Sequence, residues 1–197
     1  MSPILVLVDH HDGAVRKATT ELLTIARRLG DPVAVVIGHG AEKALETLGA
    51  YGATSVIVVD APDIDDYLIV PRAEAMLAVA EKVQPSVILL TSNAKTKEIA
   101  AHLAVKMGSG IITDAIDVQP GADGPVTSQS VFAGSFTVQA AVTRGTPIIT
   151  VKPNATTPEE APSSPSLESI EVTFTDLARA VKVTEHTPRE RTGRPDL

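Results

Sequence analysis

The polar segment at residues 91–97, Thr-Ser-Asn-Ala-Lys-Thr-Lys, has residue types that could bind a phosphate group. It follows an apolar run of strand length and precedes a segment with helical periodicity. Ligands of open α/β sheets bind at such strand-to-helix junctions. Lys95 and Lys97 put positive charge at a helix N-terminus, which the helix dipole disfavours unless an anion is bound there. Asn93 or Thr96 can cap the same helix.

Two interpretations of this segment are open. In the first, it binds the phosphate of a nucleotide. The residues that would contact this phosphate are Asn93, Lys95, Thr96 and Lys97. In the second, which we favour, the segment is a hydrated helix cap with two surface lysines. A Walker-type phosphate loop is excluded, because the segment contains no glycine.

A short glycine motif, Gly38-His39-Gly40, lies where the second predicted strand meets the second predicted helix. It resembles the start of the GxGxxG pattern of dinucleotide-binding proteins. However, Lys43 replaces the third glycine, and the motif follows the second strand rather than the first. We therefore expect a plain tight turn.

The run Asp9-His10-His11-Asp12 follows the first predicted strand and contains side chains that bind divalent metals. Neighbouring side chains on an extended chain point to opposite faces, so the run cannot close a coordination sphere alone. The carboxylates that could complete it are Asp60 and Asp114. A polar turn is the simpler interpretation, and a metal-dependent phosphoesterase is the alternative.

The sequence contains no pattern that demands catalysis. It has no GxSxG nucleophile elbow, and no spacing of serine, histidine and aspartate singles out a triad. His102 lies in a helical segment and is expected to be an ordinary boundary residue. We predict that the chain is not an enzyme.

Composition narrows the remaining classes of function. The chain has 197 residues, 44% hydrophobic and 21% charged, with a formal net charge of −7. This acidic balance argues against general binding to nucleic acid. The chain has no cysteine, which excludes disulfides and thiolate metal sites and fits a reducing compartment. The N-terminus lacks a signal-peptide pattern, and no apolar run is long enough to span a membrane. We expect a cytoplasmic protein.

Strand-like apolar runs and helical periodicity alternate over the first part of the chain. The predicted strands are Ile4–Val8, Val33–Ile37, Ser55–Val59, Ser86–Leu90 and Ile111–Thr113. The predicted helices are Val15–Leu29, Ala41–Leu48, Pro71–Val83 and Lys95–Met107. The strands are apolar on both faces, as in a parallel sheet covered by helices. We predict a doubly wound α/β fold of Rossmann-like type, with helices on both faces of a mostly parallel sheet.

The later part of the chain has a different character. Further strands are predicted at 126–132, 136–142 and 148–151. Residues 153–166 are rich in Pro, Ser, Thr and Glu, which is typical of a linker or surface loop. Two more strands are expected at 170–174 and 180–185, before a polar tail. We therefore divide the chain into an α/β domain, residues 1–152, and a linker region with two strands and a tail, residues 153–197.

Several stretches in this order resemble the N-terminal domain of the electron-transfer flavoprotein alpha subunit. The opening strand and helix of that family are similar to ILVLVDHHDGAVRKATTELLTIARRLG. The most recognisable stretch is TSNAKTKEIAAHLAVKMGSGIITDAIDV, and the segment before the third helix is DDYLIVP. An aromatic-Ala-Gly segment is matched by SQSVFAGSFTVQAAVTRGTPIITVKPNA. The resemblance covers nearly the whole chain.

This resemblance implies a function. Members of the family form a heterodimer with a beta subunit and carry electrons from acyl-CoA or other flavin dehydrogenases to an acceptor through FAD. In the family, the FAD-binding domain follows the region seen here, so we expect no cofactor in this chain. The beta subunit binds AMP with the equivalent of residues 91–97, and the alpha subunit usually does not. The alternative is a free-standing adenine-nucleotide-binding module that uses this loop.

Overall fold

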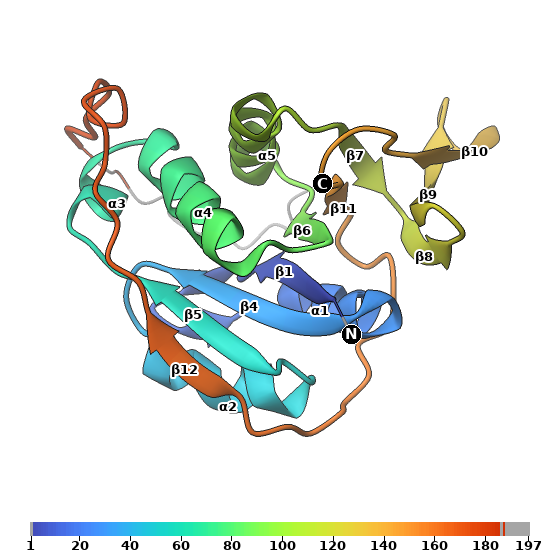
Figure 1. The fold of residues 1–197 in the computed structure, drawn as a ribbon, viewed down its shortest axis with the longest axis horizontal. Coiled ribbons are helices and arrows are strands. Elements are labelled where there is room, and N and C mark those ends of the chain that lie inside the picture. Colours follow the sequence, from blue (N-terminus) through green and yellow to red (C-terminus); the bar gives the residue numbers. More distant parts are fainter. Residues whose placement is uncertain (1, 186, 188–197) are drawn as a thin grey trace.

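The computed structural model describes residues 2–185 and 187, and its centre is a seven-stranded parallel sheet (Figure 1). The strand order is β12-β5-β4-β1-β6-β11-β7. The strands are β1 (Pro3–Leu7), β4 (Asp31–Ile37), β5 (Ser55–Val59), β6 (Val87–Thr91), β7 (Ile111–Ala115), β11 (Ile148–Val151) and β12 (Ser166–Ser169). Every neighbouring pair is parallel. The predicted strands of the first part of the chain are all present.

Helices cover both faces of this sheet, which confirms the doubly wound α/β fold. The helices are α1 (Lys17–Leu29), α2 (Ala41–Ala50), α3 (Asp63–Asp66), α4 (Val70–Val83) and α5 (Ala94–Met107). One core layer joins α4 and α5 to side chains such as Leu5 and Ile88, and the other joins α1 and α2 to their sheet neighbours such as Ile4 and Leu89. Adjacent strand residues thus point into different cores, which explains why the strands lack polar alternation. Among the described residues, no helix is long and apolar enough to cross a membrane.

A three-stranded antiparallel sheet projects from the main body. It consists of β8 (Asp117–Gly121), β9 (Gly124–Val131) and β10 (Phe136–Ala141), in the order β10-β9-β8. The predicted strands at 126–132 and 136–142 correspond to β9 and β10. Strand β8, Asp-Val-Gln-Pro-Gly, was not expected because it lacks an apolar run. A further small hairpin, not expected either, pairs β2 (His10–His11) with β3 (Ala14–Val15).

The C-terminal part of the chain differs from expectation. The strands predicted at 170–174 and 180–185 are absent, and β12 lies just before them, paired with β5. The alternating apolar residues Ile170, Val172 and Phe174 come instead from an extended segment that packs on the α4 side of the core. This segment has run past the end of β5, so it has no strand to pair with. Over 180–185 there is only one isolated bridge, from Lys182 to Tyr67.

The Pro/Ser-rich segment lies along the main body. The Glu159 amide donates to Thr24 Oγ1 at 3.0 Å, and the Ser163 amide donates to the Gly49 carbonyl at 2.9 Å. Strand β12 then joins the same sheet as the strands of the expected first domain. The division of the chain at residue 152 stays a prediction, and the predicted polar tail lies outside the described residues, except for Thr187.

Candidate functional site

A cavity of about 410 Å³ opens at the carboxyl ends of β1, β4 and β6. After β1 the chain winds outward to β4 and β5, and it then crosses to the other side of β1 to form β6. Open α/β sheets bind ligands at such a reversal of winding. The cavity is lined by residues that follow these strands, together with Asp65 and Arg72. It is therefore the place where the fold would hold a small ligand.

The predicted helix cap at residues 91–97 is confirmed. Asn93 is the N-cap residue of α5, and its Oδ1 accepts a hydrogen bond from the Thr96 amide at 3.0 Å. In return, Thr96 Oγ1 accepts from the Asn93 amide at 3.2 Å, which completes a capping box. Thr96 is buried, and its hydroxyl also donates to the Thr91 carbonyl. Both polar side chains are thus committed to the start of the helix, although both line the cavity.

The two lysines of this segment have different surroundings. Lys97 Nζ lies 2.8 Å from Asp114 Oδ2, at the end of β7. The hydrogen bond from Lys97 is the main reason why the pKa of Asp114 is lowered, and Ser92 Oγ donates to the same carboxylate at 2.8 Å. Lys97 does not belong to the cavity lining, whereas Lys95 does. Of the four residues expected to form one site, three reach the cavity and one pairs elsewhere.

Lys95 is exposed at the cavity mouth and has no hydrogen-bond or ion-pair partner among the described residues. The cavity walls displace part of its water, and this desolvation is the main reason why its pKa is lowered. Repulsion by the guanidinium of Arg72 acts in the same direction. Lys95 is therefore the one cation of the lining, within the described part of the chain, that no carboxylate neutralises directly.

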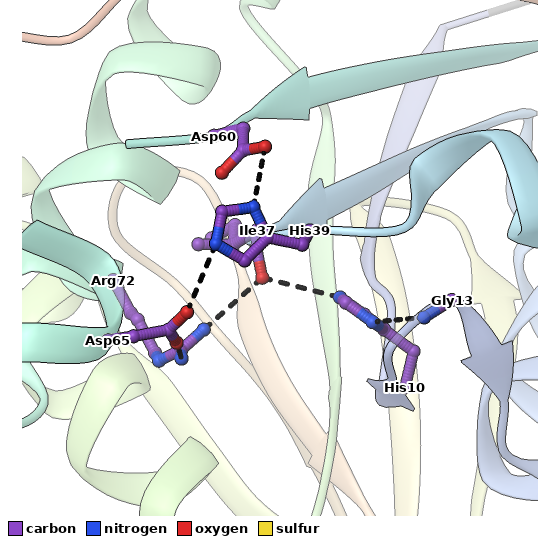
Figure 2. Close-up of polar contacts among 7 residues, drawn as sticks. All are labelled: His10, Gly13, Ile37, His39, Asp60, Asp65 and Arg72. Carbon is purple, nitrogen blue, oxygen red and sulfur yellow. Dashed lines mark hydrogen bonds and ion pairs between the residues drawn. The ribbon is translucent and has the colours of Figure 1, made fainter. Parts of the chain in front are cut away.

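The carbonyl of Ile37 joins two cavity residues (Figure 2). Arg72 Nη1 donates to this oxygen at 3.2 Å, and His10 Nε2 lies 3.3 Å from it. The Gly13 amide donates to His10 Nδ1 at 3.3 Å, which leaves the proton on Nε2 and the ring neutral. Burial is the main cause of the lowered pKa of His10. Arg72 also donates to Asp65 Oδ1 at 2.9 Å, so its charge is already paired.

His39 bridges two carboxylates at the rim of the cavity (Figure 2). Its Nδ1 is 2.9 Å from Asp60 Oδ2, and its Nε2 is 3.5 Å from Asp65 Oδ2. The hydrogen bond to Asp60 is the main cause of the raised pKa of His39, and the charge of Asp65 contributes less. The expected turn around His39 is confirmed, because Gly40 has a φ of 90° and is the N-cap residue that precedes α2. A Cβ at Gly40 would lie 2.5 Å from the backbone carbon of Asp12, so a side chain there would clash.

The residues considered for a metal site are dispersed. Asp9 lies 3.3 Å from Arg16, Asp60 contacts His39, and Asp114 contacts Lys97. Over residues 2–185 and 187, no group of three or more His, Cys, Asp or Glu side chains is arranged to hold a metal ion.

The cavity lining does not fit FAD. It contains no Phe, Tyr or Trp side chain against which an isoalloxazine ring could stack. The carboxylates of Asp9, Asp12 and Asp65 line it as well. Asp65 is paired with Arg72 and Asp9 with Arg16, so Lys95 is the one cation of the described lining that is free to attract a diphosphate, and the nearby carboxylate of Asp12 would oppose it.

The uncharged hairpin, residues 125–143, is a second candidate for function that the sequence analysis did not recognise. It has no charged residue and no histidine, although 21% of the whole chain is charged. Phe132, Phe136 and Val138 are 79%, 62% and 42% exposed. The rings of the two phenylalanines pack edge to face, with centroids 5.9 Å apart. The sequence feature that could have identified this hairpin is the absence of any charged residue over residues 125–143.

The turn of this hairpin is strained. Phe132 and Ala133 have positive φ values of 50° and 54°, a region that bulky L-residues rarely occupy. Consecutive residues with positive φ are typical of tight β-hairpin turns, and residues held in such conformations also cluster at functional sites. Strand β10 is also the edge of its sheet, so it presents backbone groups without a strand partner among the described residues. Edge, strain and exposed aromatic rings together indicate a protein-contact surface.

The chain is similar in sequence to proteins of one known family. Residues 4–177 match the family model described as electron transfer flavoprotein domain. The chain is 39% identical over 199 residues to electron transfer flavoprotein subunit alpha of Mycobacterium leprae, covering 100% of this chain and 61% of that protein. It is 40% identical over 174 residues to the protein of that name from Mycobacterium tuberculosis, with 87% and 54% covered. The corresponding Bacillus subtilis subunit is 27% identical, with 91% and 57% covered. The chain thus spans a little over half the length of these relatives.

Proposed function

Because the chain belongs to the electron transfer flavoprotein domain family, we propose that it is the scaffold domain of an electron transfer flavoprotein alpha subunit. In the whole protein, the alpha subunit and a beta subunit carry electrons from acyl-CoA or other flavin dehydrogenases to an acceptor through FAD. The observation that carries the proposal is the family match over residues 4–177, which runs from β1 through β12 to the buried segment beyond it. Relatives named as alpha subunits support it.

In this proposal the chain binds and positions other parts of the assembly and performs no reaction itself. The redox chemistry belongs to the flavin when it is bound. The cavity lining does not suit that cofactor, so we assign the flavin to residues outside this chain. A cytoplasmic location is part of the proposal.

The uncharged hairpin is the proposed contact surface for the beta subunit. Exposed aromatic side chains supply much of the binding energy of protein interfaces, because they bury a large area and lose little conformational entropy. Phe132 and Phe136 form such an anchor pair. The open edge of β10 can accept backbone hydrogen bonds from a partner strand. No charge in the hairpin would have to be desolvated when the partner binds.

We further propose that Asn93, Lys95, Thr96 and Lys97 are a vestigial nucleotide loop that now has a structural role. The capping box formed by Asn93 and Thr96 supports this assignment, as does the ion pair between Lys97 and Asp114. Only Lys95 has no structural contact. A free-standing nucleotide-binding module is not favoured.

The test co-expresses the whole alpha-subunit gene product with the beta subunit of the same organism. The proposal expects a one-to-one complex that contains FAD, with flavin absorbance that bleaches when a flavin dehydrogenase and its substrate are added. A flavin-free alpha subunit that stays monomeric beside the beta subunit would overturn it.

A further inference from the structure

The C-terminal strap, residues 170–183, runs from the end of β12 past α4 to the short helix α3 (Figure 1). Its contacts with the α3 segment are polar and numerous. Arg179 holds Asp63 with two hydrogen bonds, of 2.6 and 3.2 Å. The Val183 amide donates to the Asp66 carbonyl at 2.8 Å, and the Leu68 amide donates to the Val181 carbonyl at 3.2 Å. The strap therefore grips the outer side of this segment.

The same segment forms a wall of the cavity on its other side. In the sequence, Asp65 lies between Asp63 and Asp66, which both contact the strap. Its own carboxylate lines the cavity and is directed toward His39 and Arg72 (Figure 2). There it accepts from Arg72 at 2.9 Å and lies 3.5 Å from His39. Arg72 in turn contacts the Ile37 carbonyl. A continuous chain of contacts thus links the strap to the cavity.

Helix α3 cannot hold this position alone. It has only four residues, too few for an independently stable helix. Ile64 is its one buried residue. The position of Asp65 must therefore depend on tertiary contacts, which are the packing of Ile64 in the core and the polar contacts of Asp63, Asp66 and Leu68 with the strap.

The strap itself is anchored firmly. Phe174 is 4% exposed in the core beside α4. Glu74, a buried residue of α4, accepts hydrogen bonds from the Thr175 amide at 3.0 Å and from Thr175 Oγ1 at 2.7 Å. Arg179 Nη1 donates to the Phe174 carbonyl at 3.1 Å, which joins the anchor to the part that grips α3. These contacts define a docked state that displacement of the strap would break as a unit.

We propose that the strap is a latch for the cavity wall. When the strap is docked, α3 holds Asp65 against Arg72 and His39. When the strap is displaced, α3 loosens, Arg72 loses its carboxylate partner, and the cavity opens on that side. The docked and displaced states of the strap thus correspond to two geometries of the cavity. A force or a partner that acts on residues 170–183 shifts the population between these states and so alters the site at the carboxyl ends of the strands. This inference does not depend on which partner or cofactor the whole protein uses.

The experiment measures exchange by NMR in the full chain, for the unmodified protein, Arg179→Ala and Phe174→Ala. The readouts are the amides of Ile64, Asp65 and Asp66, which donate only within the α3 turn, and the guanidinium protons of Arg72. None of these groups touches the strap. The Val6 amide in the central strand reports global unfolding, and rates are compared relative to it.

The control is Glu168→Ala, which removes an ion pair between β12 and Lys82 of α4 without touching α3. We expect exchange at the four readouts to rise roughly two- to fivefold in Arg179→Ala, as for loss of a partly exposed ion pair. We expect a rise of about tenfold or more in Phe174→Ala, because a buried aromatic anchor is lost. The control should leave the readouts unchanged. Readouts that stay at their original ratio to Val6 in both strap variants would overturn the proposal.

Discussion

The cavity and the uncharged hairpin present opposite surfaces. In the cavity most charged groups are already paired: Arg72 with Asp65, and His39 with Asp60. In the hairpin the largest side chains, Phe132 and Phe136, contact each other and remain 79% and 62% exposed. Most charged groups of the cavity thus already have a partner within the chain. The hairpin, in contrast, leaves apolar side chains exposed and, within the described part of the chain, the backbone groups at the edge of its sheet unpaired.

This difference shows where the molecule still has binding energy to gain. A surface whose groups are satisfied gains little from a ligand, because new contacts must replace existing ones. Exposed aromatic rings gain the full hydrophobic term when a partner covers them. A cavity at the usual ligand position of an α/β sheet can therefore have a structural role. The binding surface can instead lie on an element outside the main sheet, such as the uncharged hairpin.

The largest predicted effect comes from removing the apolar anchor of the hairpin. Replacing both Phe132 and Phe136 with Ser should weaken the proposed binding to a beta subunit about 100-fold, as expected for loss of two aromatic hot spots. The melting temperature of the chain should change little, because both side chains are exposed. Isothermal titration calorimetry measures the affinity.

The control for the hairpin variant is Val105→Ser, which removes an apolar side chain that is 84% exposed on α5. It should bind the beta subunit with the affinity of the unmodified chain. Equal loss of affinity in both variants would mean that general surface polarity, rather than the hairpin, controls binding.

A smaller effect is expected from the capping box. Asn93→Ala should lower the stability by about 1 kcal/mol, because an amide at the start of α5 loses its acceptor. For a chain of this size that corresponds to a fall in melting temperature of about 2–4 °C. Gln139→Ala, which removes an exposed amide without a capping contact, serves as the control. An unchanged melting temperature for Asn93→Ala would contradict the structural role of the loop.

His39 should give a smaller and pH-dependent effect. Its pKa in the folded chain is raised above the ordinary value of 6.5, mainly by the hydrogen bond to Asp60. The charged ring therefore stabilises the fold fully below 6.5, and this contribution disappears as the pH rises through the folded-state pKa. His39→Gln should lower the melting temperature at about pH 5.5 and leave it almost unchanged at about pH 8.5. If His39→Gln lowered the melting temperature more at the higher pH than at the lower one, Asp60 would not stabilise the protonated ring.

Lys95→Ala should have the smallest effect. Lys95 makes no ion pair among the described residues, so its loss should move the melting temperature by less than about 1 °C. Neither AMP nor ATP should raise the melting temperature of the unmodified chain, because a ligand stabilises only the state that binds it. A nucleotide-dependent rise that disappears in Lys95→Ala would restore the nucleotide interpretation of the cavity.

The sequence was sufficient for the elements whose signals are local. Apolar runs such as Ser55–Val59 and helical segments closed by glycine, such as the one before Gly108, are present as predicted. Strand β8 was not predicted because Pro120 and Gly121 are untypical of strands. The apolar residues beyond β12 resembled a strand because every second residue of this extended segment packs on the core. A local pattern of alternating apolar residues therefore does not distinguish a strand paired in a sheet from an extended segment that only packs against the core.

The candidate site was less predictable for the same reason. Asn93 could be recognised as a cap because its partner is three residues away. The partner of Lys97 comes from another strand, and only the sheet order brings Asp114 beside it. Arg72 was not considered, although an arginine in the first turn of a helix is as unusual as the lysines at 95 and 97.

The proposed interface is tested most directly by hydrogen–deuterium exchange of the chain with and without the beta subunit that we propose as its partner. Peptides covering residues 125–143 should become protected in the complex, because the edge of β10 gains hydrogen bonds and the aromatic rings of the hairpin are covered. Peptides covering residues 7–13 and 91–97 should exchange as in the free chain. Protection at these cavity loops with an unchanged hairpin would contradict the account.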